Sequence, residues 1–217
     1  MLPDTILSFP DAERLSWDEC QLLVIPQLDT ICGKFYETDI IHNNHIHFNI
    51  NASIAEDTMF LYEYLLYCSS IRFISNVLYN YCKREQSATT RFHLDFANSI
   101  SQLHQTQKKF FVRLLSRRQP QLFLQIMHSL AIYHFGLVTS YYIQSPACSI
   151  KVKMNICRQA CKLYRQDYYQ EVSSDKLSAY LQNWIKHYGY YFRNRHWFLY
   201  FLKMHVVTMV KRFRKLH

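Results

Sequence analysis

An acidic pair, Glu56 and Asp57, stands directly before a stretch of helical periodicity. Apolar residues follow at positions 60, 61, 64, 65 and 68, which predicts that the pair lies in the first turn of a helix. Free amides and the helix dipole stabilise anions there. A carboxylate held ionised in this way can accept a proton from an attacking hydroxyl. Ordinary N-terminal capping is the alternative, since Ser53 and Glu56 have the spacing of a capping box.

The candidate metal ligands in the sequence are weaker than the candidate proton acceptors. His42, His45 and His47 lie close together in an asparagine-rich stretch, but the spacing His-x2-His-x-His matches no metal-ligand pattern known to us, and a solvated loop explains it better. The seven cysteines show no zinc-type spacing either. Cys157 and Cys161, four residues apart on a predicted helix, are interpreted as buried or half-buried free thiols. The sequence predicts no metal site.

The acidic pair belongs to a predicted region, residues 1–95, that contains both helices and strands. A short helix is expected after Ser16, ending near Pro26. The segment ICGKFY (31–36) is expected as a buried strand or strand end, and residues 37–44 as a short helix or turn. The helix of the acidic pair follows, and residues 71–76 and 77–84 are expected as two short strands because they are rich in β-branched and aromatic residues.

Residues 96–217 form the second predicted region, which is helical throughout. Helices are expected at about 93–116, 119–143, 150–170, 174–189 and 193–215, from their apolar periodicity and from breaks near Pro120, Pro146 and Ser173. Only three glycines and five prolines occur in the chain, which favours long helices. The predicted fold class is therefore α+β and mostly helical, with regions 1–95 and 96–217.

Glycine use and charge exclude some functions. None of the three glycines lies in a GxGxxG or GxxxxGK setting, so the sequence contains no glycine-rich phosphate loop. Residues 1–175 carry no net charge, and the whole formal charge of +9 comes from residues 176–217, which contain no acid. The first 15 residues carry acids and lack a long apolar core, so no secretory signal is expected.

Several short motifs accompany the acidic pair. They are Gly33-Lys34-Phe35-Tyr36, Ile46-His47-Phe48, Ala55-Glu56-Asp57, and Leu78-Tyr79-Asn80-Tyr81 followed by Arg84, Ser87 and Thr89. In this order, residues 15–95 resemble the second half of the catalytic domain of bacterial family-2 glycosyltransferases. The resemblance implies the acceptor half of a GT-A-type domain, followed here by a helical C-terminal region.

The resemblance also implies a chemistry. Family members are inverting, nucleotide-sugar-dependent transferases that act on saccharide or lipid-linked acceptors, as in polysaccharide biosynthesis. Asp57 would be the general base for the acceptor hydroxyl, and Glu56 would help to position the acceptor. Lys34, Tyr79 and Arg84 would form the substrate-binding wall, with Arg84 facing the donor phosphates.

The sequence departs from the family pattern in one large respect. The family's first half binds the nucleotide and carries a D-x-D motif for Mg or Mn, and no Asp-x-Asp occurs in these 217 residues. LLVIPQLDT (22–30) resembles the family's opening strand, but it lies directly before GKFY, which leaves no room for a nucleotide-binding half. The chain is therefore expected to be an N-terminally truncated member that is inactive alone. A non-catalytic helical protein that binds a membrane or a partner is the alternative.

The C-terminal residues 193–217 combine apolar and basic character. The apolar run 196–210 is interrupted by Lys203 and His205, and no uninterrupted apolar run reaches the roughly 18 residues needed to span a bilayer. This composition predicts reversible binding to an anionic membrane surface. A packed terminal helix with a solvated cationic end fits equally. The expected location is the cytoplasm, either free or peripheral at the inner face of the membrane. No nucleic-acid module is recognisable, and nucleic acid is not an expected partner.

Overall fold

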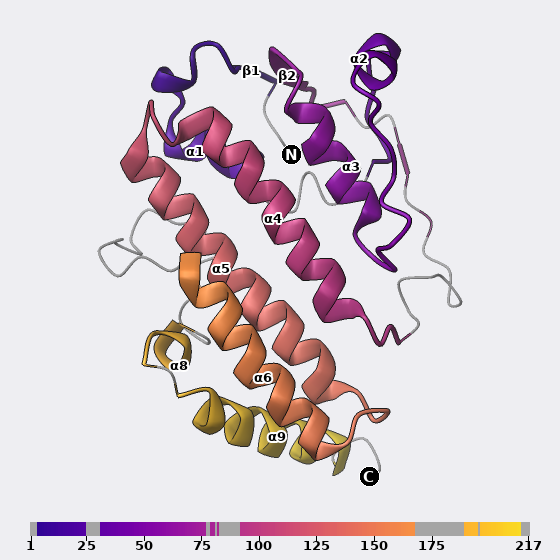
Figure 1. Ribbon diagram of the computed structural model, residues 1–217, viewed down its shortest axis with the longest axis vertical. Helices are drawn as coiled ribbons and strands as arrows, with labels where there is room; N and C mark the ends of the chain where they lie inside the picture. Colours follow the sequence, from indigo (N-terminus) through magenta and orange to yellow (C-terminus); the bar gives the residue numbers. More distant parts are fainter. Residues whose placement is uncertain are drawn as a thin grey trace. The chain divides into compact units, whose positions relative to one another are not determined.

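The computed structural model describes residues 4–24, 31–76, 79–80, 82, 92–167, 189–194 and 196–213 (Figure 1). Most of these residues are helical and few lie in strands, so the predicted α+β, mostly helical class is confirmed. The chain divides into two compact units, residues 1–123 and 124–217. The first unit extends beyond the expected boundary at residue 95 because α4 (Phe96–Leu115) packs along α3 (Glu56–Leu65).

The first unit begins with a small two-stranded sheet. Strand β1 (Thr5–Ser8) pairs antiparallel with β2 (Ser70–Phe73), and Thr5 lies opposite Phe73. The short helix η1 (Ala12–Arg14) and helix α1 (Trp17–Leu22) follow β1. The loop after α4 holds this segment in place, since the Gln119 amide donates to the Leu15 carbonyl at 2.8 Å.

Helix α1 starts where the sequence predicts, and its capping is reciprocal. The Glu19 amide donates to the Ser16 hydroxyl at 3.2 Å, and the Ser16 amide donates to the Glu19 carboxylate at 2.7 Å. This pair of bonds satisfies two amide donors that the first turn of a helix leaves free.

The core of the first unit lies between α3 and α4, which run side by side in Figure 1. Tyr62 of α3 meets Phe110 of α4 edge-on, with ring centroids 5.7 Å apart, and Phe9 packs on the same Phe110 ring at 5.6 Å. The buried Tyr62 hydroxyl donates to the Leu23 carbonyl. Aromatic burial of this kind fixes α3 against α4.

The three expected strands of the first region have different outcomes. Residues 31–37 form a turn and an irregular segment, with Phe35 88% exposed, so the expectation of a buried strand over 31–36 is wrong. The strand expected over 71–76 is confirmed in part by β2. Of the strand expected over 77–84, only Tyr79, Asn80 and Cys82 lie within the described residues, and none of the three is in a strand.

The second unit is built from α5 (Pro120–Gln144), α6 (Ile150–Tyr164), η3 (Arg165–Asp167), α8 (Tyr190–Arg193) and α9 (Trp197–Phe213). Ser149 caps α6 by accepting from the Val152 amide at 3.4 Å. Buried Lys153 donates from Nζ to the Ile143 carbonyl in the last turn of α5 at 2.9 Å. Figure 1 shows α9 running across α6, which it contacts.

The predicted helices of this region are found with shifted ends. The one expected over 193–215 is interrupted, since α8 ends at Arg193 and α9 begins at Trp197. The helix expected over 174–189 lies outside the described residues, apart from residue 189.

Helix α5 is the most apolar element. It contains no Asp, Glu, Lys or Arg, and within the described residues it is the one helix long and apolar enough to cross a membrane. The lack of an uninterrupted run of 18 apolar residues in the sequence therefore does not exclude a helix long and apolar enough to span a bilayer. In the fold, however, 72% of its most apolar window is buried. Because a helix that is apolar all round must be covered by protein or by lipid, this burial accounts for α5 as a core helix.

Candidate functional site

The acidic pair occupies the first turn of α3, as the sequence predicts. Ala55 precedes it with φ 63° and ψ 16°, a left-handed conformation that residues other than glycine rarely adopt. Glu56 and Asp57 are both half-buried, and the Thr58 amide donates to Asp57 Oδ1 at 2.7 Å. The chain therefore turns sharply at Ala55 and places two carboxylates at the positive end of a rigid helix.

The expected capping box at this helix does not form. The Ser53 hydroxyl instead donates to Asp95 at 2.5 Å, and its amide donates to the Ser99 hydroxyl at 3.2 Å. The Ser53 hydrogen bond lowers the pKa of the Asp95 carboxyl below its usual value. Ser53 thus ties the loop before α3 to the start of α4 and leaves the capping of α3 to its own first turn.

Tyr36 links the GKFY segment to the acidic pair. Its ring packs edge-on against Phe60 and Tyr64 of α3, with ring centroids 5.8 and 5.0 Å away. Burial, and after it the negative charge of Asp57, raise the pKa of the Tyr36 phenol. The phenol therefore stays protonated near Asp57, and its buried hydroxyl forms no hydrogen bond with any described residue.

Sequence reasoning did not select Tyr36 as a site residue. The sequence pointed to Tyr36 only through its place at the end of the GKFY motif. An aromatic residue in an apolar run is more often a core residue than a ligand contact. The half-buried ring together with the unpaired hydroxyl distinguishes it from an ordinary core tyrosine such as Tyr64, whose hydroxyl accepts from the Glu37 amide at 2.8 Å.

Gly33 brings the GKFY segment against Tyr79. Gly33 has φ +70°, and a Cβ at this position would lie 3.3 Å from the Tyr79 Cβ. Two of the predicted substrate-binding residues, Lys34 and Tyr79, are thus placed on neighbouring segments that are 45 residues apart in sequence. Lys34 is half-buried and Tyr79 is 50% exposed. Arg84, the third such residue, lies outside the described residues, and its role stays a prediction.

The Ile46-His47-Phe48 segment completes the surroundings of α3. Ile46 is buried with Phe60 and Tyr64 in one hydrophobic cluster. Phe48 stacks on Phe60, with ring centroids 4.6 Å apart and an interplanar angle of 13°. The GKFY segment and the Ile46-His47-Phe48 segment therefore both pack on Phe60 of α3, the helix whose first turn carries the acidic pair.

The three histidines of this region have exposed side chains. His42, His45 and His47 are all exposed, and His45 has φ 50°. Among the described residues, no three His, Cys, Asp or Glu side chains come together as a metal site. All seven cysteines are free, and burial raises the pKa of the Cys157 thiol to about 12. The buried Cys157 thiol is therefore protonated, which does not suit a metal ligand, since metals bind the thiolate.

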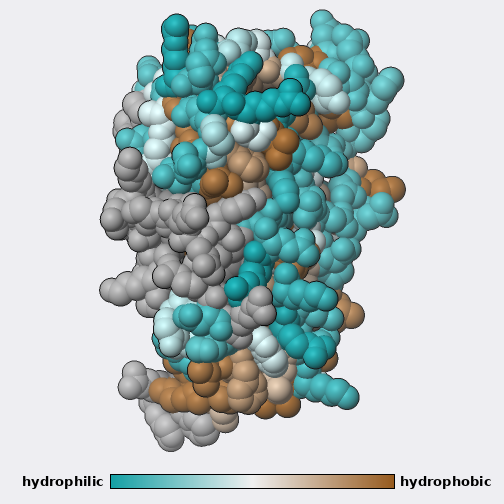
Figure 2. Space-filling view, turned by 60° about the vertical axis from the view of Figure 1, so that its left-hand side comes forward, coloured by the Kyte–Doolittle hydropathy of each residue, from teal (hydrophilic) through white to brown (hydrophobic). Residues whose placement is uncertain are grey.

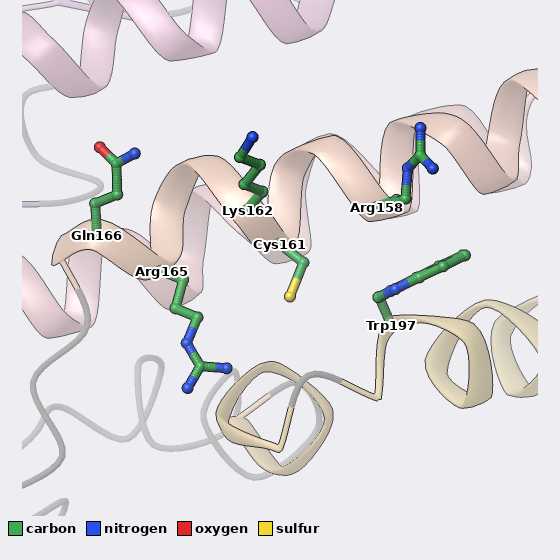
Figure 3. A pocket seen from close by; sticks show the side chains of 6 residues that line it. All are labelled: Arg158, Cys161, Lys162, Arg165, Gln166 and Trp197. Atoms are coloured by element: carbon green, nitrogen blue, oxygen red, sulfur yellow. The ribbon is translucent and has the colours of Figure 1, made fainter.

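A separate pocket of about 480 Å³ lies in the second unit (Figure 3). Its described lining residues are Arg158, Cys161, Lys162, Arg165, Gln166 and Trp197. Figure 3 shows five of them along α6 and η3, with the Trp197 ring facing them from the start of α9. Three of these described side chains are basic and none is an acid, so the described part of the lining favours anions and supplies no carboxylate as a proton acceptor.

Compared with known proteins, the chain matches no protein-family model, no curated protein and no solved structure. The functional assignment therefore depends on the residues and on their arrangement.

Proposed function

We propose that the first unit is the acceptor side of an inverting, nucleotide-sugar-dependent glycosyltransferase of family 2, with Asp57 as its general base. One observation carries the proposal: the motif-bearing segments meet around α3. Gly33 lies against Tyr79, and Tyr36 and Phe48 both pack on Phe60. Segments that merely shared a composition with the family would have no reason to gather at the helix that carries the acidic pair.

The proposed reaction uses the acidic pair on one side of the transferred sugar. The Asp57 carboxylate accepts the proton of an acceptor hydroxyl, and the oxygen attacks the anomeric carbon of the donor. The bond between that carbon and the diphosphate oxygen breaks, the diphosphate leaves with the electron pair, and the configuration inverts. Glu56 positions the acceptor through its remaining hydroxyls, and the Tyr36 phenol supplies a hydrogen-bond donor beside the base.

The donor side is not part of this arrangement. In a complete family member, Mg or Mn would neutralise the charge of the leaving diphosphate. The described residues offer no cluster of ligands for such an ion, and the sequence has no D-x-D motif. The nucleotide sugar and its metal would therefore need residues beyond these 217, and the chain's own contribution is the base and the acceptor wall.

The test supplies the donor side and changes the base. The full chain would be fused behind the nucleotide-binding half of a family-2 transferase, and the release of nucleoside diphosphate would be measured with a set of saccharide and lipid-linked acceptors. Asp57→Asn should lower turnover by about 10²- to 10⁴-fold, the range of general-base catalysis. Glu56→Gln should have a milder effect. Asp39→Asn, an exposed acid in the first turn of α2 (Thr38–Asn43), is the matched control and should change nothing.

Two results would contradict the proposal. Turnover of the Asp57→Asn fusion equal to that of the parent fusion would remove Asp57 from the mechanism. The genomic DNA upstream of Met1 gives an independent test that needs no active fusion. A reading frame that encodes an IIPxYN-like strand and a D-x-D motif is expected there, either continuous with this chain or frameshifted from it. Upstream DNA without such coding potential would favour the non-catalytic alternative, a helical protein that binds a membrane or a partner.

A further inference from the structure

Helix α9 has one face inside the second unit and one face outside it. On the inner face, Tyr200 and Phe201 are 1% and 2% exposed. The Tyr200 hydroxyl lies 2.9 Å from the Thr139 hydroxyl of α5, and its ring packs on Phe135 at 5.3 Å. These contacts fix the rotation of α9 about its own axis, so the identity of the outward residues is determined by the packing.

The outer face of α9 is apolar along most of its length. Its exposed apolar residues, at 37–58% exposure, are Phe198, Leu199, Leu202, Val206, Val207, Met209 and Val210. Phe198, Leu202 and Val206 follow one another at intervals of four residues, which places them in one row on a helix. In Figure 2, hydrophobic side chains gather at the foot of the view, where Figure 1 has α9. A contiguous apolar face of this kind marks an interaction surface, unlike single exposed apolar residues.

The charge of the C-terminal sequence selects the partner of this face. Residues 176–217 hold nine Lys and Arg and no acid. Lys203 interrupts the apolar face and lies over the Tyr191 ring, 5.3 Å from its centroid. Lys211 and Arg212 stand in the last turn of α9. A second copy of the chain would bring the same cations to the contact and would repel the first, whereas a surface rich in phosphate groups would attract them.

We propose that the outer face of α9 docks on an anionic lipid surface. The helix has 17 residues, fewer than the roughly 20 that a bilayer-spanning helix needs. It would lie in the plane of the interface, with Phe198, Leu202 and Val206 among the acyl chains and the lysine and arginine ends at the headgroups. This inference is independent of the proposed sugar transfer, because it uses neither the acidic pair nor any residue of the first unit.

The experiment measures co-sedimentation of the full chain with vesicles. Vesicles of phosphatidylcholine with phosphatidylserine are compared with vesicles of phosphatidylcholine alone, at low and high salt. We expect at least about tenfold tighter binding to the anionic vesicles, weakening as salt is added. The double variant Leu202→Gln/Val206→Gln should lose at least about tenfold of that affinity, since both side chains point outward. Ile150→Gln, which replaces an apolar residue of α6 that is 55% exposed, is the matched control and should bind as the parent does.

A second double variant, Lys211→Gln/Arg212→Gln, tests the contribution of charge. It should bind the anionic vesicles more weakly, and its binding should depend less on salt. A helical circular dichroism spectrum equal to that of the parent shows that each variant is folded. Three results would overturn the proposal: equal binding to neutral vesicles, no binding to either vesicle, or undiminished binding by Leu202→Gln/Val206→Gln. Lipid-free self-association that this double variant abolishes, measured by analytical ultracentrifugation, would assign the face to a second copy of the chain and would also overturn it.

Discussion

At the scale of single residues, two tyrosines of one cluster differ in how their hydroxyls are satisfied. Tyr64 accepts from the Glu37 amide at 2.8 Å, while the buried Tyr36 hydroxyl forms no hydrogen bond with the described residues. Tyr64 lies in the last turn of α3, and the Tyr36 ring packs edge-on against it. The Tyr64 hydroxyl therefore contributes to the fold. The Tyr36 hydroxyl is free to bind a ligand in the proposed site, since buried polar groups without partners are rare in native proteins.

We predict opposite stability effects for the two hydroxyl deletions. Tyr64→Phe leaves the Glu37 amide without its acceptor and should lower the free energy of unfolding by about 1 kcal/mol. Tyr36→Phe removes a buried group that has no described partner and should leave it within about 0.5 kcal/mol or raise it. Urea unfolding followed by circular dichroism measures both. A loss of stability in Tyr36→Phe as large as that in Tyr64→Phe would assign the Tyr36 hydroxyl a structural role.

At the scale of elements, α5 and α6 are joined by one buried cation. Lys153 of α6 is 5% exposed and donates to the Ile143 carbonyl, which lies in the last turn of α5. Carbonyls there have no partner within their own helix, and a cation at a helix C-terminus is favourable. The end of one helix is therefore satisfied by the beginning of the next, across the loop at Pro146.

We predict that Lys153→Met lowers the free energy of unfolding by about 1 to 2 kcal/mol, since it keeps most of the side-chain volume but removes the charge and its hydrogen bond. Lys151→Met is the control. Lys151 is exposed in the first turn of the same helix, where a cation is not favoured by the helix dipole, so its loss should change stability by less than about 0.5 kcal/mol. Equal midpoints of thermal unfolding for the two variants would show that the buried contact contributes little.

The elements also show what the sequence could and could not reveal. The long helices and the start of α3 followed from apolar periodicity and from the acidic pair, which are local signals. The ICGKFY segment was mistaken for a strand because its apolar and aromatic residues match strand composition. Its true form depends on the left-handed Gly33 and on the approach of Tyr79, a contact between distant segments that no local pattern encodes. For the same reason the acidic pair was identified from the sequence, whereas the unpaired Tyr36 hydroxyl was not.

At the scale of the whole molecule, the 217 residues divide their chemistry unevenly. The acidic pair and the proposed acceptor-binding residues belong to the first unit, and the excess positive charge belongs to the end of the second. Neither a D-x-D motif nor a glycine-rich phosphate loop occurs anywhere in the sequence. An electrostatic attraction to phosphates is thus present without the geometry that would bind a nucleotide diphosphate together with its metal.

We predict that the chain alone binds no nucleoside diphosphate in a metal-dependent way and transfers no sugar. Calorimetric titration with a nucleoside diphosphate should give the same weak, salt-sensitive heat with and without Mg or Mn, because the basic groups act as point charges. Stoichiometric binding that appears only with the metal would show that these residues contain a donor site. That donor site would then be formed by segments that lack the family's motifs.

The burial of α5 has a consequence for synthesis. This helix, the most apolar of the described helices, is covered in part by side chains that follow it: His134 packs near Tyr164 of α6, and the Thr139 hydroxyl lies beside that of Tyr200, 61 residues further along. A ribosome therefore releases α5 before Tyr200 of α9 has been translated. During that interval the nascent chain displays a 25-residue segment without Asp, Glu, Lys or Arg, the kind of segment that membrane-insertion machinery selects by hydrophobicity. The chain is most exposed to misrouting in the time between the translation of α5 and that of α9.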